Sequence, residues 1–354
     1  MPTSISGTNG VTFPDNTVQA TAGYTGFRNR IINGAMVIDQ RNAGAAVTTD
    51  GSYAVDRFIF GKSGSQTFTG QSSTTAPSGF TNSISVTIGT GASPGASDRL
   101  TLSQSIEGFN VADLGWGTAD AQSITFSFWV RSSLTGAFGV AFRNSATNRA
   151  YVASYTVSAA NTWEYKTLTI PGDTSGTWAK DNTAGIFLNF DLGCGSTFST
   201  TSGSWQAGNF LGLTGGVKLN ATSGATFYIT GVQLEKGSVA TPFEYRQYGT
   251  ELMLCQRYYW VMTATQGTAA SATLARFNVS HPWMRAAPSV SATAALKVSD
   301  ESFSDYTQTV TGIFVQANDA SGGRYTAGDF SGMTTNRAAN LLTTGGNVRF
   351  SSEL

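Results

Sequence analysis

Charged residues are scarce in this sequence. Asp, Glu, Lys and Arg make up 12% of its 354 residues, about half of the ~25% that is usual for soluble globular proteins. The 21 acidic and 21 basic residues cancel, so the chain has no net charge at neutral pH. Proteins that bind nucleic acid carry an excess of basic residues that neutralise phosphates. The composition therefore argues against nucleic acid as a partner.

Histidine and cysteine are nearly absent. The chain has one histidine, His281, and two cysteines, Cys194 and Cys255, with no Cys-x-x-Cys motif. This excludes the common zinc sites, which need several histidines or paired cysteines. Two cysteines also do not make a disulfide framework, and we expect both to be buried or half-buried thiols.

Long hydrophobic runs are missing too. No stretch of roughly 18 apolar residues is present, so we expect no insertion into a membrane. The N-terminus, MPTSISGTNG, has no basic start and no apolar core, so it lacks the features of a secretory signal peptide. We expect synthesis in a cytoplasm, from which the protein could still leave by lysis inside a particle.

Catalytic motifs are also lacking. The chain contains no Gly-x-Ser-x-Gly elbow, no His-Glu-x-x-His motif and no P-loop. Its glutamates are scattered, and no two of them define the acid and nucleophile pair of a glycosidase. His281 lies before a proline in a segment that bridges two predicted strands, where a structural role is favoured. We therefore expect no enzyme activity and no cofactor.

The patterns that are present indicate an all-β protein. Glycine is abundant, with 41 residues, and aromatic residues make up 12%, a composition typical of strands joined by tight turns. Many such strands, with no long helical pattern between them, predict a β-sandwich or β-barrel in the central part of the chain. Apolar residues alternate with polar ones in Ser83–Ile88, Arg99–Ile106, Ser123–Val130, Ala150–Val157 and the row Ile186, Leu188, Phe190 and Leu192.

One strand changes the face of its apolar residues. In Thr226–Leu234 the apolar positions shift from Phe227 and Ile229 to Val232 and Leu234. A shift by one residue would invert the faces of a regular strand. We therefore expect a β-bulge at Thr230–Gly231.

One helix separates the sandwich from a smaller C-terminal β-sandwich domain. The helix is predicted at Glu251–Tyr259, with its N-cap at Gly249–Thr250 and with Leu252, Cys255 and Tyr259 on one face. The domains are thus expected at residues 27–246 and 247–354. Strands of the second domain are expected at Arg257–Ala264, Ala272–Ser280, Thr307–Ala317 and Asn347–Leu354.

Residues 1–26 are expected to form a separate N-terminal unit. In Gly10–Ala22, Val11 and Phe13 alternate with polar residues, a turn follows at Pro14–Asn16, and Val18 resumes the alternation. Too few apolar residues are present for a core, so the unit needs copies of itself or a partner. It is either a stub for attachment or trimerisation or a disordered tail.

Several polar and aromatic residues are candidates for special roles. Trp116, Trp163, Trp178 and Trp205 lie in Gly/Ser/Thr-rich surroundings, where indole rings could stack on sugars; the alternative is that each plugs an end of the sandwich. Turns at Asp173, Asp181 and Asp191 could hold a structural Ca²⁺, although no EF-hand spacing exists. The pairs Asp39/Arg41 and Asp56/Arg57 are expected to form ion pairs that fix strand ends.

Stretches across the chain resemble one known family. They are Gly10–Ala22, Asn29–Met36 with Asp39–Arg41 and Tyr53–Phe58, Gly231–Trp260, and Met284–Val290. These stretches are similar to segments of bacteriophage and prophage tail-fibre proteins, whose central domain is a jelly roll. The mixture of tryptophan with Asn, Asp and Gln also resembles carbohydrate-binding modules with jelly-roll folds.

The resemblance implies a virion protein that attaches to the host cell surface. It implies a homotrimer, contact with other virion tail proteins through the N-terminal stub, and binding to a host surface glycan or protein. Two alternatives stay open. One is a structural virion component, such as a baseplate, head-fibre or decoration protein, with no receptor of its own. The other is a depolymerase that cuts the host glycan.

Overall fold

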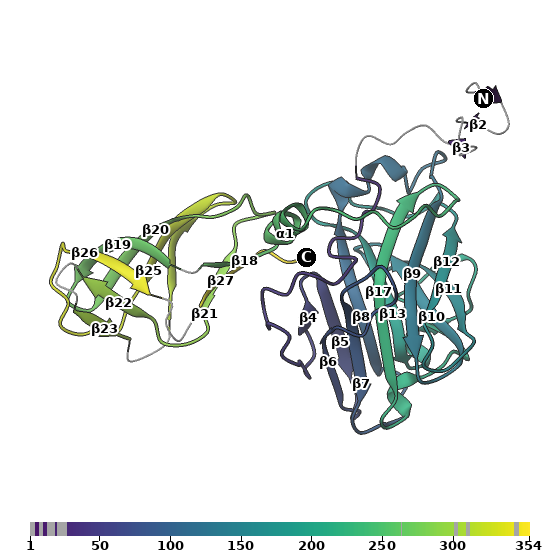
Figure 1. The fold of residues 1–354 in the computed structure, drawn as a ribbon, viewed down its shortest axis with the longest axis horizontal. Coiled ribbons are helices and arrows are strands. Elements are labelled where there is room, and N and C mark those ends of the chain that lie inside the picture. Colours follow the sequence, from purple (N-terminus) through teal and green to yellow (C-terminus); the bar gives the residue numbers. More distant parts are fainter. Residues whose placement is uncertain are drawn as a thin grey trace.

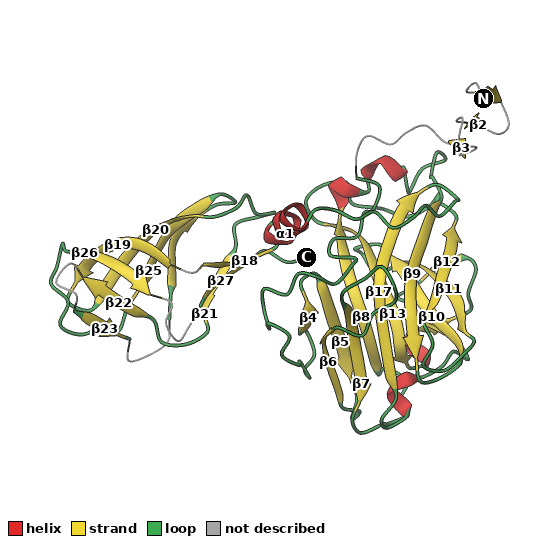
Figure 2. Ribbon diagram, in the orientation of Figure 1, coloured by secondary structure: helices red, strands yellow, loops and turns green. Residues whose placement is uncertain are grey.

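The protein consists of two β-sandwiches joined at a short helix (Figures 1 and 2). The computed structural model describes residues 4–6, 10–12, 18–19, 27–262, 264–300, 304–308, 312–342 and 347–354. Strands dominate, which confirms the all-β prediction. No helix in these ranges is long and apolar enough to cross a membrane.

The central jelly-roll sandwich packs two antiparallel sheets face to face. The seven-stranded sheet has the order β15 (Trp205–Ala207), β11 (Arg149–Val157), β10 (Gly136–Arg143), β13 (Ala184–Cys194), β8 (Arg99–Glu107), β5 (Phe58–Ser63) and β4 (Tyr53–Val55). The five-stranded sheet has the order β12 (Glu164–Ile170), β9 (Ile124–Ser132), β17 (Thr226–Lys236), β7 (Ser83–Ile88) and β6 (Phe68–Ser73). Because several sheet neighbours, such as β13 and β8 or β9 and β17, are distant in sequence, the chain crosses repeatedly between the two layers.

Short elements lie at the ends and on the outside of this sandwich. The strands β14 (Ser199–Thr200) and β16 (Gly212–Leu213) form a small parallel pair. Four single-turn 3-10 helices are η1 (Gly108–Asn110), η2 (Ala112–Leu114), η3 (Ser196–Phe198) and η4 (Leu219–Ala221).

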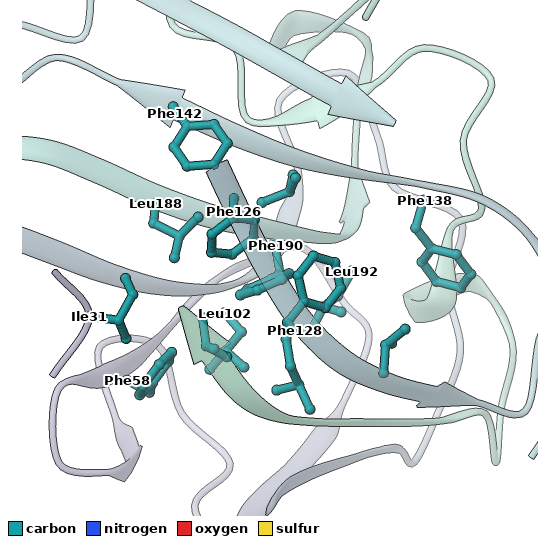
Figure 3. Close-up of a cluster of buried hydrophobic side chains, with 14 of the residues drawn as sticks. Ile31, Phe58, Leu102, Phe126, Phe128, Phe138, Phe142, Leu188, Phe190 and Leu192 are labelled. Atoms are coloured by element: carbon teal, nitrogen blue, oxygen red, sulfur yellow. The ribbon is translucent and has the colours of Figure 1, made fainter. Parts of the chain in front are cut away.

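Aromatic side chains from both sheets fill the core between the layers (Figure 3). Phe126 of the five-stranded sheet contacts Phe142 and Phe190 of the seven-stranded sheet, with ring centroids 5.3 and 5.7 Å apart. The apolar rows predicted from the sequence, including Leu100 and Leu102 and the row Ile186, Leu188, Phe190 and Leu192, point into this core and are buried. Their polar neighbours in the strands therefore face outward, because side chains alternate along a strand.

The predicted β-bulge is present in β17. Its pairing with β9 shifts register between Thr230 and Gln233. Gly231 has a φ of 60°, a left-handed conformation that glycine adopts without strain. Phe227 and Leu234 are an odd number of positions apart, so in a regular strand they would face opposite sides. The bulge lets both side chains point into the same core.

The predicted helix exists with different boundaries. Helix α1 spans Tyr248–Gln256 and follows Gln247 as its N-cap, so the predicted cap at Gly249–Thr250 and the end at Tyr259 are wrong. The Glu251 carboxylate points inward and accepts hydrogen bonds from the Arg246 guanidinium and from the backbone N–H of Asn33. The helix ends early because Tyr259 pairs with Ser351 in a sheet.

Apolar and charged groups together seat the second domain on the sandwich. Cys255 and Tyr258 pack against Ile32 and Ile38. The buried Glu107 carboxylate accepts hydrogen bonds from Arg257, with Nη2 2.5 Å and Nε 2.9 Å away, and from the Tyr258 hydroxyl at 2.7 Å. The buried Glu107 carboxylate thus has a cationic partner and hydrogen-bond donors at the joint, which a buried charge needs in order to be stable.

The ion pairs expected near strand ends use a different partner. Arg41 lies 4.0 Å from Asp56 but 2.5 Å from Glu353, and Arg57 also pairs with Glu353. Asp39 instead accepts the backbone N–H groups of a turn. The prediction holds in part, since Arg41 and Asp56 form an ion pair. It missed Glu353, because folding brings this residue, distant in sequence, to both arginines.

The C-terminal domain is a second, smaller sandwich. A seven-stranded sheet has the order β23 (Asp305–Thr307), β22 (Lys297–Asp300), β26 (Ala338–Leu342), β19 (Ala264–Ser271), β20 (Leu274–Ser280), β25 (Gly322–Ala327) and β24 (Phe314–Asn318). A three-stranded sheet has the order β18 (Tyr259–Met262), β27 (Val348–Ser351) and β21 (Ser289–Ala292). His281 is buried beside Trp260 and Phe350, which gives it a packing role.

The described parts of the N-terminal unit form a small antiparallel sheet. It consists of β1 (Ser4–Ser6), β2 (Gly10–Thr12) and β3 (Val18–Gln19). The predicted turn at residues 14–16 lies outside the described residues.

Asp56 is expected to make the stability of the protein depend on pH. Burial raises the pKa of this carboxyl from 3.8 to about 6, while hydrogen bonds from Gln40 and the charge of Arg41 oppose the rise. Between these pH values the folded state binds more protons than the unfolded state, so stability falls as pH rises from about 4 to about 6. Over this pH range the free energy of unfolding should fall by about 3 kcal/mol.

Replacement Asp56→Asn should remove this fall, because the amide does not titrate. Urea unfolding of the parent and the variant at several pH values measures the difference. A difference that does not change with pH across this window would contradict the assignment.

Candidate functional site

The outer face of the seven-stranded sheet is polar where neighbouring strands meet. Since Leu100 and Leu102 of β8 point into the core, Thr101 and Ser103 point outward, and Asn189 of β13 lies opposite Ser103. Gly61 of β5 lies on the other side of Thr101. The result is a surface of small polar side chains flanked by strands.

A segment spanning residues 195–217, here called the covering segment, contributes the edge strand β15, and its remaining parts lie over part of this outer face. Its Leu213 packs on Ala141 of β10 and Val152 of β11, with Phe210 beside them. A Cβ on Gly139 would lie 2.9 Å from the backbone nitrogen of Leu213. Glycine at this position therefore allows the covering segment to lie directly on the sheet.

A buried carboxylate fixes the covering segment in place. Asp191 of β13 is fully buried and accepts the backbone N–H groups of Gly193 and Leu213, each at 2.9 Å. Lys218 approaches the same carboxyl at 3.5 Å. Burial raises the pKa of Asp191, while the charge of Lys218 and the two backbone N–H groups oppose the rise.

A cleft of about 360 Å³ lies beside the covering segment, which contributes Phe198, Asn209 and Leu211 to its lining. This volume lies within the ~300–1,000 Å³ typical of small-molecule sites. Strand residues form the floor, the covering segment forms one wall, and the turn Asp50–Gly51 forms the other. Its further lining residues are Ile59, Phe60, Gly61, Arg99, Thr101, Ser103, Arg143 and Asn189.

Hydrogen bonds hold the polar side chains of the cleft in fixed orientations. Arg143 donates from Nε to Asn189 Oδ1 at 3.1 Å and from Nη1 to Asn209 Oδ1. Asn189 in turn donates to Ser103 Oγ at 2.5 Å. Burial, and then repulsion from Arg99, lower the pKa of Arg143 to about 10, so it stays charged at neutral pH.

An aromatic ring completes the cleft. Phe198 of η3 is half-buried in the lining, and the Arg99 guanidinium lies 5.8 Å from its ring centroid. Amide, hydroxyl and guanidinium groups beside an apolar ring can bind a ligand that has hydroxyl groups and C–H faces. A saccharide has both. This arrangement can bind such a ligand without any covalent chemistry.

Three of the four predicted tryptophans come together elsewhere in the sandwich. The ring centroids of Trp116, Trp178 and Trp205 lie 4.7 to 5.3 Å apart, each pair near perpendicular. Trp116 and Trp178 are 3% and 7% exposed, so neither offers a free ring face. Their indole N–H groups bind carbonyl or carboxylate oxygens within the fold. The structure gives these two residues a packing role instead of a glycan-stacking one.

Trp163 and Trp205 are half-buried, and glycan stacking on them stays a prediction. Trp163 lies apart from the cluster, with its ring 6.3 Å from that of Tyr228 on the five-stranded sheet. Trp205 donates its indole N–H to the Pro171 carbonyl at 2.8 Å.

A second hollow lies on the outer face of the five-stranded sheet. It is lined by Trp129, Tyr165 and Phe243 among others. The rings of Trp129 and Tyr165 lie 5.4 Å apart. This hollow is aromatic but has no charged side chain in its lining among the described residues.

The aspartates proposed for calcium do not gather. Asp173 pairs with Arg149 at 2.5 Å, Asp181 binds Thr183 of its own turn, and Asp191 is engaged as described above. Within the described residues, no group of three or more His, Cys, Asp or Glu side chains could hold a metal ion.

Sequence patterns did not identify the cleft. Arg99 and Asn189 alternate with the buried rows of their strands, so their outward orientation follows from the sequence. Arg143 belongs to no recognisable sequence motif. In addition, nothing in the sequence shows that β10, β13, β8 and β5 are neighbours in one sheet. The sheet order was the missing information.

Solved structures with some similarity to the chain include a phage tailspike domain and carbohydrate-binding modules. No protein-family model and no curated protein matches the chain. The enzymatically active domain of tailspike protein 4 from bacteriophage CBA120 is 13% identical, with a TM-score of 0.32 over 59% of this chain and 21% of that chain. The chain thus spans about a fifth of the tailspike domain.

The modules are matched over nearly their whole length. A family 11 carbohydrate-binding module from Clostridium thermocellum, in complex with a β-1,3-1,4-mixed-linked tetrasaccharide, is 14% identical, with a TM-score of 0.28 over 56% of this chain and 100% of the module. TmCBM61, in complex with β-1,4-galactotriose, is 11% identical, with a TM-score of 0.27 over 59% of this chain and 99% of that chain. Similarity this low supports no inference about function, so the cleft is interpreted from its own residues.

The packing role of the tryptophan cluster predicts a large effect on stability. Trp116→Ala should lower the free energy of unfolding by about 3–5 kcal/mol, because a buried indole is lost and a cavity remains. Trp163→Ala is the matched control, and its half-buried ring should cost clearly less. Chemical denaturation measures both. Equal losses in the two variants would contradict the packing role.

Proposed function

We propose that this chain is an attachment protein that binds a saccharide of a host cell surface in the cleft on the seven-stranded sheet. The observation that carries the proposal is the hydrogen-bonded set Arg143, Asn189, Asn209 and Ser103, which lies beside the Phe198 ring in one cleft. Side chains fixed in this way lose little freedom on binding, and preorganisation favours affinity.

The chemistry of the lining supports binding without cleavage. Glycosidases generally place two carboxyl groups on either side of the scissile bond. Among the described residues that line the cleft, Asp50 provides the one carboxyl. We therefore propose a binding protein and treat depolymerisation as an outcome that the binding experiment can reveal.

The wider setting of the proposal comes from the sequence. The four stretches that resemble tail-fibre proteins support a homotrimer in the virion, with residues 1–26 contacting other tail proteins. The three short strands of this N-terminal unit total few residues, and sheets this small are marginal alone. Packing against two further copies would supply the missing contacts. Mass measurement on the full chain should give three copies, and a stable monomer would contradict the fibre assembly.

Filling the cleft should abolish saccharide binding. Ile59→Trp places an indole in the lining and leaves every charge unchanged, so we expect loss of binding to host cells and to an array of bacterial surface polysaccharides. Ser154→Trp is the matched control, because Ser154 is exposed on β11 of the same sheet and lies outside the cleft lining.

The outcomes separate the functional classes. Binding by the parent and the Ser154→Trp control, but not by Ile59→Trp, supports the proposal. Equal binding by all three proteins would place the binding site elsewhere. No binding by the parent to any cell or polysaccharide would indicate a structural virion component, and release of reducing sugar would indicate a depolymerase.

A further inference from the structure

Arg143 is a buried cation without a buried anion. Among the described residues, Arg57 and Arg143 are 3% and 9% exposed, and the side chain of Arg246 is 4% exposed and pairs with Glu244 and Glu251. Arg57 pairs with the carboxylate of Glu353. Arg143 has neutral partners, the amide oxygens of Asn189 and Asn209. Buried charges are normally paired with an opposite charge, so Arg143 is incompletely compensated.

A second unpaired cation shares the cleft. The side chain of Arg99 forms neither a salt bridge nor a hydrogen bond with any described residue, and its guanidinium lies near the Phe198 ring. Repulsion between Arg99 and Arg143 contributes to the lowered pKa of Arg143. Two guanidinium groups in one cleft repel each other until an anion lies between them.

The nearby carboxyl groups do not neutralise these arginines. Asp191 lies beneath the covering segment, where it binds Lys218 and the backbone of Leu213. Asp50 belongs to an exposed turn and accepts the backbone N–H of Lys62 at 2.6 Å. Neither forms a salt bridge with Arg99 or Arg143 among the described residues. The positive charge of the cleft is therefore directed toward solvent and any ligand.

We propose that the cleft takes an acidic saccharide, with its anionic group held between Arg99 and Arg143 and its ring against Phe198. This inference rests on the proposed function. Guanidinium groups bind carboxylate and other oxyanions through paired, charge-assisted hydrogen bonds. The anionic oxygens could belong to a ring carboxylate, as in a uronic or sialic acid, or to a sulfate ester, and the experiment separates these sources.

The experiment compares each acidic polymer with its neutral counterpart. Purified full-length protein is tested by biolayer interferometry on polygalacturonate, hyaluronan and polysialic acid, on the same polymers after chemical reduction of their carboxyl groups, and on dextran sulfate against dextran. We expect binding to an acidic polymer that is lost on its neutral counterpart and weakened by added salt. Loss on carboxyl reduction identifies a carboxylate, and binding confined to dextran sulfate identifies a sulfate ester.

Arg99→Gln is the decisive variant. It removes one charge and breaks no hydrogen bond among the described residues, so it should fold, as a thermal melt would verify. We expect binding to the acidic polymer to weaken about tenfold to a hundredfold. Arg131→Gln is the matched control, because Arg131 lies on the other sheet, over the Tyr228 ring, and should leave binding unchanged.

Failure of this inference differs from failure of the proposed function. If the protein binds reduced and unreduced polymers equally, and Arg99→Gln binds as the parent does while Ile59→Trp does not bind, the acidic ligand is excluded and saccharide binding stands. If the protein binds none of these polymers but still binds host cells or the polysaccharide array through the cleft, the acidic ligand is contradicted and saccharide binding stands. If it binds no cell and no polysaccharide, both proposals are contradicted.

Discussion

A single buried carboxylate underlies the candidate site. Asp191 points away from the core, yet it is fully buried because the covering segment lies over it. Its oxygens accept backbone N–H groups from both the sheet and the covering segment, and Lys218 supplies the opposite charge. Such a carboxylate is stable inside a protein only while these partners stay in place. The wall of the cleft therefore depends on this one group.

The cleft and the joint use charge in opposite ways. At the joint, Glu107 and Glu353 each receive guanidinium groups, so the two sandwiches meet through satisfied ion pairs. In the cleft, Arg99 and Arg143 have no such partner among the residues that the structure describes. In a chain with so few charged residues, this contrast separates charges that hold the fold together from charges that the proposed acidic ligand would neutralise.

Local patterns in the sequence predicted much of the sandwich. Alternation located the inward rows of β8, β9 and β13, and the change of parity located the bulge at Gly231. The weakly patterned strands of the second domain were missed. β19, for example, reads ATQGTAAS and buries little more than Ala269, so alternation gives no signal there.

The candidate site was harder to predict than the fold. Tryptophans in polar surroundings suggested sugar stacking, but Trp116 and Trp178 are buried against each other. Polar surroundings in sequence did not mean exposure, because residues distant in the chain close over these rings. The cleft depends on sheet order and on the path of the covering segment, and both are long-range properties that no local pattern encodes.

The most direct test of the central claim is the hydrogen-exchange footprint of a bound saccharide. Amide exchange would be compared with and without oligosaccharides cut from a polymer that the protein binds. The account predicts protection in residues 50–51, 99–103 and 198–211, and unchanged exchange around Trp163 and on the outer face of the five-stranded sheet. Protection confined to that face or to the C-terminal domain would contradict it.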